Sequence, residues 1–173
     1  MLWLTTPAIQ DGPLFDRAAC ATALGLSVDD TLNVKPQLLQ AGNRFIFIAL
    51  RDRAAVDRAF IGADAIQKLR GADDREPSGV FVFTPTTDGA YSRVFVPEFG
   101  VAEDPATGSA TGPLALYMMR NGLAPSSRFV SEQGTKMGRP SALHINIRGE
   151  MGAGGIEVGG HTTSVAEGWM NAP

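Results

Sequence analysis

Apolar residues fall into short blocks along the chain, where they alternate with polar residues or run without interruption. Blocks of about four to eight residues with this pattern, rich in β-branched and aromatic side chains, predict β-strands. We therefore expect strands at residues 33–41, 44–50, 79–84, 91–96, 128–132, 142–148, 155–158 and 162–168. The strand at 44–50 is apolar on both faces, which predicts that both faces are buried.

Other blocks repeat their apolar residues every three or four positions or so, which is the spacing of one helix face. These blocks predict helices at residues 14–24, 53–60, 64–70 and 108–120. The first helix would bury one face, made of Leu14, Ala18, Ala21 and Leu24. The last is apolar nearly all round, which is typical of a helix in the core of a protein.

Turns rich in glycine separate many of the predicted strands. They fall at Gly42-Asn43, Thr87-Asp88-Gly89 and Gly159-Gly160, and the charged stretch at 73–76 predicts a solvated loop. No internal repeat or low-complexity linker divides the chain. We therefore expect an α+β fold in which residues 1–173 form a single lobe, with a curved, mostly antiparallel sheet rolled around a central buried helix.

Composition and charge argue against several classes of protein. The 173 residues carry a net charge of −3 without a cluster of lysine and arginine, so we expect no nucleic-acid partner. No apolar run reaches the length of a membrane span, so we expect no membrane partner. Residues 1–11 lack the pattern of a secretory signal. Cys20 is the only cysteine, which favours a reducing compartment, here the cytoplasm, and its place in a predicted helix favours a core position.

The segment EDPATGSA, residues 103–110, directly precedes the predicted core helix. Pro105 disfavours a helical conformation for Asp104, so we expect Asp104 in the loop that leads into the helix, and Thr107 is a suitable N-cap residue. The free amides of the first helical turn, together with the helix dipole, suit a carboxylate or a phosphate. Asp104 is close enough in sequence to carry a proton or accept a hydrogen bond beside the same anion.

A purely structural interpretation explains the same residues. An Asp-Pro pair followed by a capped helix start is common in proteins that bind nothing there. Gly108 and Gly112 lie four positions apart, so they would equally let another element pack closely on one face of the helix. Local sequence alone leaves both interpretations open.

Three stretches in the second half of the chain together resemble one protein family. They are RVFVP (93–97) followed by EDPATGSA (103–110), then EQG (132–134) with MGRPS (137–141), and finally IEVGG (156–160). In this order they are similar to the signature of PhzF-type phenazine-biosynthesis proteins. The resemblance implies the fold of diaminopimelate epimerase. It also implies a cofactor-independent isomerase that moves a proton at a carbon of a small carboxylate.

Carried over to this sequence, the family motif assigns catalytic roles to Asp104 and Ser109. Asp104 would assist proton transfer or bind the substrate, and Ser109 would anchor a carboxylate. Substrate binding would also involve the helix start at Thr107, Gly108 and Ala110. The resemblance implies no cofactor. The epimerases and racemases of this fold use a pair of cysteines, which the segment lacks, so a two-thiol mechanism is not expected.

Several other polar residues have mainly structural interpretations. His144 lies within a predicted strand and His161 follows a predicted turn, without the spacing of metal ligands, so no metal site is expected. The segment from Gln133 to Ser141 is a candidate for a loop beside the site, with Arg139 as a partner for an anion, but its turn rich in glycine and proline favours a surface position for Arg139. Arg93 alternates with apolar residues and is a candidate for the site face, whereas Glu103 is expected to point away from Asp104.

The chain departs from the family in its length. Full-length members have two similar lobes, and this sequence resembles only the second. The first lobe normally supplies a glutamate and a Gly-His pair, and Gly160-His161 lies in a different context. We therefore expect a homodimer or a complementary lobe to complete the site around a small carboxylate-bearing molecule. The alternative is a catalytically silent module for binding or assembly.

Overall fold

The computed structural model describes residues 1–69, 77–149 and 155–170, so the charged stretch at 73–76 lies outside the described residues. The strands are β1 (Leu2–Thr5), β2 (Gln10–Leu14), β3 (Gln37–Ala41), β4 (Asn43–Ala49), β5 (Gly79–Thr86), β6 (Gly89–Val96), β7 (Val101–Asp104), β8 (Arg128–Gln133), β9 (Ser141–Ile147) and β10 (Ile156–Gly160). The α-helices are α1 (Arg17–Ala23), α2 (Arg53–Arg58), α3 (Ala63–Leu69) and α4 (Gly108–Arg120). Short 3-10 helices are η1 (Val28–Asp30), η2 (Pro97–Phe99) and η3 (Thr135–Met137). In the part of the chain that the structure describes, every helix is too short or too polar to cross a membrane.

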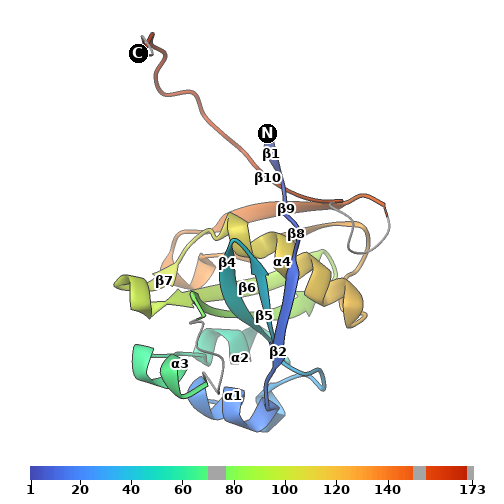
Figure 1. Ribbon diagram of the computed structural model, residues 1–173, viewed down its shortest axis with the longest axis vertical. Coiled ribbons are helices and arrows are strands. Elements are labelled where there is room, and N and C mark those ends of the chain that lie inside the picture. The colour runs from blue at the N-terminus through green and yellow to red at the C-terminus, as the bar shows by residue number, and fades with distance from the viewer. Residues whose placement is uncertain (70–76, 150–154, 171–173) are drawn as a thin grey trace.

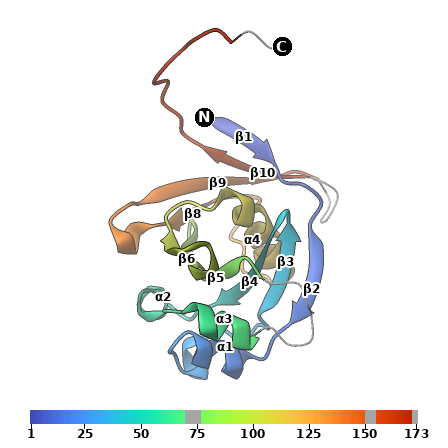
Figure 2. The ribbon, with the colours of Figure 1, turned by 60° about the vertical axis from the view of Figure 1, so that its left-hand side comes forward.

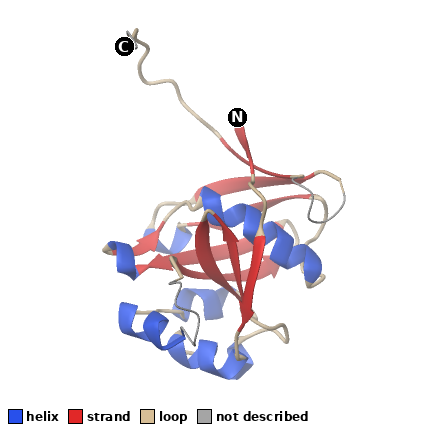
Figure 3. Ribbon diagram, in the orientation of Figure 1, coloured by secondary structure: helices blue, strands red, loops and turns tan. Residues whose placement is uncertain are grey.

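The strands form one ten-stranded sheet in the order β1-β10-β9-β8-β6-β5-β4-β3-β2, with β7 added to β6. The pairs β4–β5 and β6–β8 are parallel, and the other pairs are antiparallel. β1 and β2 follow one another in the chain but lie at opposite ends of this order. Residues 6–9 therefore connect the two end strands of the curled sheet. Helix α4 lies inside the curl and α1, α2 and α3 lie together outside it (Figures 1 and 3). The predicted α+β fold around a central helix is confirmed.

The two faces of the sheet bury separate sets of apolar side chains. On the inner face, the ring of Phe47 lies 5.3 Å from that of Phe81 and 6.0 Å from that of Tyr117, which belongs to α4. On the outer face, Ile46 and Ile48 of β4 pack with α1, α2 and α3. Burying one such side chain contributes about 1.5–3 kcal/mol. The predictions that β4 is buried on both faces and that α4 is a core helix are confirmed.

The N-terminal part differs from the prediction. Leu14 is exposed and belongs to β2, which the sequence pattern does not predict. Helix α1 begins only after Asp16, whose side chain accepts a hydrogen bond from the Ala19 amide at 2.8 Å. Ala18 is exposed as well. The buried residues of this segment are Cys20, Ala21 and Leu24. The aspartate N-cap, rather than the apolar spacing, sets the helix start.

The C-terminal part contains the largest error. Gly159 and Gly160 form no hairpin turn but belong to β10, which pairs with β9 and β1. Residues 162–168 form no strand, and Figures 1 and 2 show them leading away from the body as an extended segment. The edge of β10 is already occupied by β1, whose Trp3 packs on Gly159. A Cβ at Gly159 would lie 2.6 Å from Trp3 Cε3, so glycine is needed here for close packing.

Candidate functional site

Asp104 is held between a strand and a helix. It is the last residue of β7, where it lies opposite Val94 of β6, and α4 starts shortly after it. The prediction that Asp104 belongs to a loop is wrong, because the edge of β6 recruits residues 101–104 as a short strand. The strand and the helix together fix the position of this half-buried carboxylate.

Gln133, at the end of β8, connects Asp104 to the start of α4. Its side chain is fully buried, and its Oε1 accepts a hydrogen bond from the Thr107 amide at 3.1 Å. Its Nε2 donates to the Asp104 carbonyl oxygen at 2.7 Å and to Thr107 Oγ1 at 3.0 Å. Thr107 occupies the N-cap position, but its hydroxyl donates to Asp104 Oδ2 at 2.6 Å instead of capping the helix. Gln133 therefore satisfies the Thr107 amide, and the threonine hydroxyl is left for the carboxylate.

The segment after β8 supports the same corner of the molecule. Gly134 has a φ of 77°, a conformation that favours glycine. A Cβ on Gly134 would lie 2.8 Å from the Pro105 carbonyl oxygen, so the two segments pack backbone against backbone. The Gly134 carbonyl accepts a hydrogen bond from the Arg139 amide at 2.9 Å. The side chain of Arg139 is exposed, which confirms its predicted surface position.

The predicted substrate-binding residues at the start of α4 differ in accessibility. Gly108 is half-buried, Ser109 is exposed and Ala110 is fully buried. Ser109 Oγ accepts a hydrogen bond from Asn43 Nδ2 at 3.4 Å, so the β3–β4 turn lies beside the helix start. The Ala110 amide donates to the Thr107 carbonyl at 3.1 Å, whereas the Gly108 and Ser109 amides find no acceptor among the described residues. Two such amides at the positive end of a helix dipole suit an anion.

A pocket of about 480 Å³ opens beside this helix start. Leu4, Leu143 and Val158, from β1, β9 and β10, give it an apolar wall, and Gly108 lies at its helical side. The other lining residues are Ala106, Ser141, Ala142, Gly159, Gly160 and His161. Neither of the two predicted catalytic residues is part of this lining. The pocket and the carboxylate are therefore neighbours of the same helix end, without forming one enclosed cavity.

The charged residues next to Asp104 are directed away from it. Glu103 pairs with Arg93 through two bonds, Nε to Oε1 at 3.0 Å and Nη2 to Oε2 at 2.8 Å. Arg93 is buried, and its Nη1 also donates to the carbonyl oxygens of Val56, Asp57 and Ala59. The prediction for Glu103 is confirmed. The hypothesis that Arg93 faces the site is wrong, because the alternation of β6 turns it toward α2 on the outer face.

Glu132, the neighbour of Gln133, also faces outward. The hydrogen bond from Arg53 Nη2, at 2.8 Å, holds the pKa of Glu132 below its usual value, and the Thr135 hydroxyl adds a second bond at 2.7 Å. The Arg53 guanidinium also lies 4.4 Å from the centre of the Tyr91 ring. Glu132 and Arg53 are therefore engaged in contacts with each other and with neighbouring side chains. Of the three carboxylates Glu103, Asp104 and Glu132, Asp104 is the one that lies at the start of α4.

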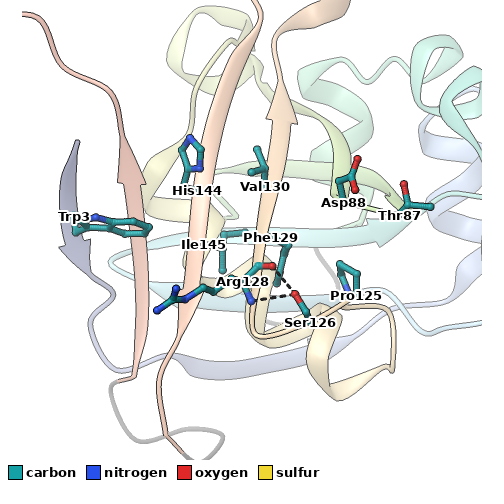
Figure 4. A pocket seen from close by; sticks show the side chains of 10 residues that line it. All are labelled: Trp3, Thr87, Asp88, Pro125, Ser126, Arg128, Phe129, Val130, His144 and Ile145. Carbon is teal, nitrogen blue, oxygen red and sulfur yellow. Dashed lines mark hydrogen bonds between the residues drawn. The ribbon is translucent and has the colours of Figure 1, made fainter.

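A second pocket of about 480 Å³ lies over β8 and β9 (Figure 4). Trp3 and His144 lie at one side of it, and Thr87 and Asp88 of the β5–β6 turn lie at the other. The structure brings the ring of His144 to 5.6 Å from that of His161. Across residues 1–69, 77–149 and 155–170, however, no three His, Cys, Asp or Glu side chains are grouped so as to hold a metal ion. None of the predicted site residues lines this pocket.

From the sequence, Gln133 belonged to a candidate loop beside the site, but no role was predicted for its side chain. Along β8, exposure alternates from residue to residue, and Gln133 falls on the buried side with Phe129 and Ser131. A buried side-chain amide needs hydrogen-bond partners for its donors and its acceptor. The position of Gln133 on the buried side of the strand was therefore the signal that could have predicted its role. The EQG stretch, which contributes to the family resemblance, contains the same residue. The hydrogen bonds themselves join residues more than twenty positions apart and leave no local pattern.

Comparison of sequences relates the chain to a defined group of proteins. The family described as phenazine biosynthesis-like protein, PhzC-PhzF, matches residues 1–168. The chain is 40% identical over 134 residues to trans-2,3-dihydro-3-hydroxyanthranilate isomerase of Pseudomonas aeruginosa, which covers 76% of this chain and 46% of that protein. It is 30% identical over 139 residues to the uncharacterized isomerase YddE of Escherichia coli K12, with 76% and 46% covered.

Comparison of structures agrees with the sequence comparison. A Predicted Epimerase of Pseudomonas aeruginosa matches with a TM-score of 0.70 and 30% identity, over 92% of this chain and 54% of that one. A phenazine biosynthesis protein of Bacillus anthracis, from the PhzF family, matches in fold with a TM-score of 0.73 at 15% identity, over 90% and 55%. The chain therefore spans about half the length of the relatives that it matches.

Proposed function

Because the chain belongs to the phenazine biosynthesis-like (PhzC-PhzF) family, we propose that it is one lobe of a cofactor-independent isomerase. The lobe binds a small carboxylate at the start of α4, and Asp104 assists in moving a proton at a carbon of that molecule. The observation that carries this proposal is the pairing of two amides without acceptors, those of Gly108 and Ser109, with a carboxylate fixed at the same helix end. A cytoplasmic location belongs to the proposal and is supported by the single cysteine, Cys20.

The helix start provides the groups that a carboxylate needs. Backbone N–H groups and the helix dipole together favour a negative charge there, and the exposed Ser109 hydroxyl adds a further donor. The apolar wall formed by Leu4, Leu143 and Val158 is suited to the hydrocarbon part of such a ligand. A ring-bearing carboxylate, the kind of molecule named for the Pseudomonas aeruginosa isomerase, fits both features.

Completion of the site requires a second contribution. The relatives are about twice as long as the matched region, so each contains a further half that this chain does not match. We propose that a second copy of the chain or a separate complementary lobe covers the start of α4. The covering part would supply the group that exchanges the proton with Asp104 across the bound carboxylate.

Two measurements test the proposal. In the first, benzoate is titrated into the ¹⁵N-labelled protein, and we expect the Gly108 and Ser109 amide signals to shift with saturation. In the second, trans-2,3-dihydro-3-hydroxyanthranilate is incubated with the protein in D₂O, and we expect deuterium to appear at a substrate carbon. Asp104→Asn should abolish deuterium uptake, while its circular dichroism spectrum stays that of the wild type. Deuterium uptake at the wild-type rate in this variant would contradict the role of Asp104.

A silent module for binding or assembly is the second candidate. The observation that favours it is the exposure of apolar side chains on β1, where Leu2 and Leu4 are 68% and 62% exposed. Surfaces of this kind mark contacts with another protein. Benzoate binding without deuterium uptake, in a protein whose partner surface is occupied, would favour this candidate over the isomerase.

A further inference from the structure

The side chain of Gln133 has one possible orientation in the structure, and backbone groups determine it. The Thr107 amide can only donate a hydrogen bond, so the Gln133 atom at 3.1 Å from it must be the oxygen, Oε1. The Asp104 carbonyl can only accept, so the Gln133 atom at 2.7 Å from it must be the nitrogen, Nε2. A flipped amide would place two donors together at one end and two acceptors at the other.

This orientation also determines the direction of the threonine hydroxyl. Gln133 Nε2 lies 3.0 Å from Thr107 Oγ1, and because an amide nitrogen donates, Oγ1 accepts this bond. The single hydroxyl proton is therefore left for Asp104 Oδ2, at 2.6 Å. That distance falls in the range of roughly 2.5–2.7 Å that is typical of a hydroxyl donating to an ionised carboxylate. The bonds run in one direction, from Gln133 through Thr107 to Asp104.

We propose that Gln133 is a positioning residue that keeps Asp104 Oδ2 an acceptor, so that Asp104 exchanges protons through Oδ1. The inference rests on the proposed function of Asp104 and adds the atom at which the proton moves. When Asp104 gives up its proton, the Oδ1–H bond breaks and a C–H bond forms at the substrate, and the reverse step restores Oδ1–H. When the C–H bond forms, the substrate carbon supplies its electron pair and the pair of the broken O–H bond stays on Oδ1. When the C–H bond breaks, its electron pair stays on the carbon and Oδ1 supplies the pair for the new O–H bond.

A glutamate side chain in place of Gln133 would have the same shape but the opposite hydrogen-bonding character. A carboxylate has no N–H to give to the Asp104 carbonyl or to Thr107 Oγ1. The threonine proton would then turn to the introduced carboxylate, and Asp104 Oδ2 would lose its donor. Gln133→Glu therefore reverses the direction of the chain of bonds, and Thr107→Val removes its middle link without changing the size of the side chain.

The first test needs no ligand. We expect the Gln133 Nε2 protons to exchange with D₂O at least about tenfold more slowly than those of the exposed Gln67, because both are donated in hydrogen bonds and the Gln133 side chain is fully buried. In Thr107→Val, the proton that was donated to Oγ1 should exchange faster, while its partner on the same nitrogen stays protected. Exchange of both Gln133 protons as fast as those of Gln67 in the wild type would overturn the proposal.

The second test measures kcat and KM for deuterium uptake from D₂O into trans-2,3-dihydro-3-hydroxyanthranilate. Loss of the donated bond leaves Asp104 Oδ2 without its fixed donor, so Thr107→Val and Gln133→Glu should lower kcat about tenfold or more. Thr107→Ser retains a hydroxyl and should restore the wild-type kcat. A Thr107→Val kcat equal to that of the wild type would contradict the positioning role. If the wild type neither binds benzoate nor takes up deuterium, the proposed function fails, while the amide-exchange test still decides the orientation of Gln133.

Discussion

Gly112 of α4 lies directly against Thr6, in the segment that bridges β1 and β2. A Cβ at Gly112 would lie 2.5 Å from Thr6 Cγ2, whereas a Cβ at Gly108 would meet nothing within 4 Å. The structural interpretation is therefore confirmed for Gly112, whereas the predicted role of Gly108 in ligand binding stays a prediction. We expect Gly112→Ala to lower the free energy of unfolding by about 1–3 kcal/mol, because the added methyl group overpacks a closed contact. Urea denaturation measures this change.

Gly108→Ala is the matched test of ligand binding. The added methyl group faces open space beside the pocket, so the free energy of unfolding should stay equal to that of the wild type or rise by a few tenths of a kcal/mol. Benzoate binding should weaken about tenfold or more, because the methyl group obstructs the approach to the amides of the first turn. Calorimetric titration of the two glycine variants separates the roles. Unchanged affinity in Gly108→Ala would argue against binding at this helix start.

Gly134 makes a separate prediction about the support of the site. Its φ of 77° and its packing on Pro105 leave no room for a side chain. Gly134→Ala should therefore cost about 1–3 kcal/mol of stability and disturb the segment that holds Asp104. The matched control is Gly138→Ala, since Gly138 has a similar φ of 73° but nothing within 4 Å of its Cβ position. Denaturation of both variants separates packing from backbone strain, and equal losses would contradict the close contacts of Gly134 with Pro105 and Arg139.

Elements that depend on interactions between residues close in sequence were predicted more accurately than elements that depend on distant segments. Helix α4 was predicted with its observed bounds because its apolar residues and its glycine-containing start are local signals. β1, β2 and β7 were missed because each is short and is stabilised by a strand distant in sequence or by the edge of a finished hairpin. The strand predicted at 162–168 contains β-branched residues that favour a strand, but β1 already occupies the sheet edge that it would need.

The candidate site shows the same division. Asp104 and Ser109 were named from a contiguous motif, and the structure places both at the start of α4. Gln133 was missed because its role depends on hydrogen bonds between β8 and the segment before α4. Arg93 was placed on the wrong face because an alternating strand gives two faces but does not say which one meets α2.

Cys20 is expected to resist chemical modification. Burial raises the pKa of its thiol to about 12 from an ordinary value of 9.0, with a smaller contribution from Asp16. Iodoacetamide should therefore label the native protein far more slowly than the protein in urea. The folded state disfavours the thiolate form of Cys20. The contribution of the Cys20 thiol to stability is therefore complete below pH 9.0 and declines as the pH rises toward about 12. Denaturation of Cys20→Ala should show a shallower decline over this range, and an unchanged slope would contradict the burial effect.

The two end strands of the sheet make a final prediction about self-association. β1 carries the exposed apolar side chains Leu2, Trp3 and Leu4 and no charge, and β10 is its only partner strand within the described residues. Natural proteins protect such edges with charged residues, proline or bulges, and β2 at the other end has Asp11, Pro13 and a shift of register.

If a second copy covers this lobe, β1 is therefore the edge that it should use. We expect light scattering to show a dimer for the wild type and a monomer for Leu2→Lys, since a lysine on an edge strand opposes pairing. Leu14→Lys is the matched control, because Leu14 on β2 is also exposed, at 57% against 68% for Leu2, and it should leave the mass unchanged. Leu2 is not part of the pocket beside α4, so benzoate affinity in the monomeric variant reports on the helix start itself. A wild type that stays monomeric at all concentrations would instead mean that a complementary lobe, rather than a twin subunit, must complete the site.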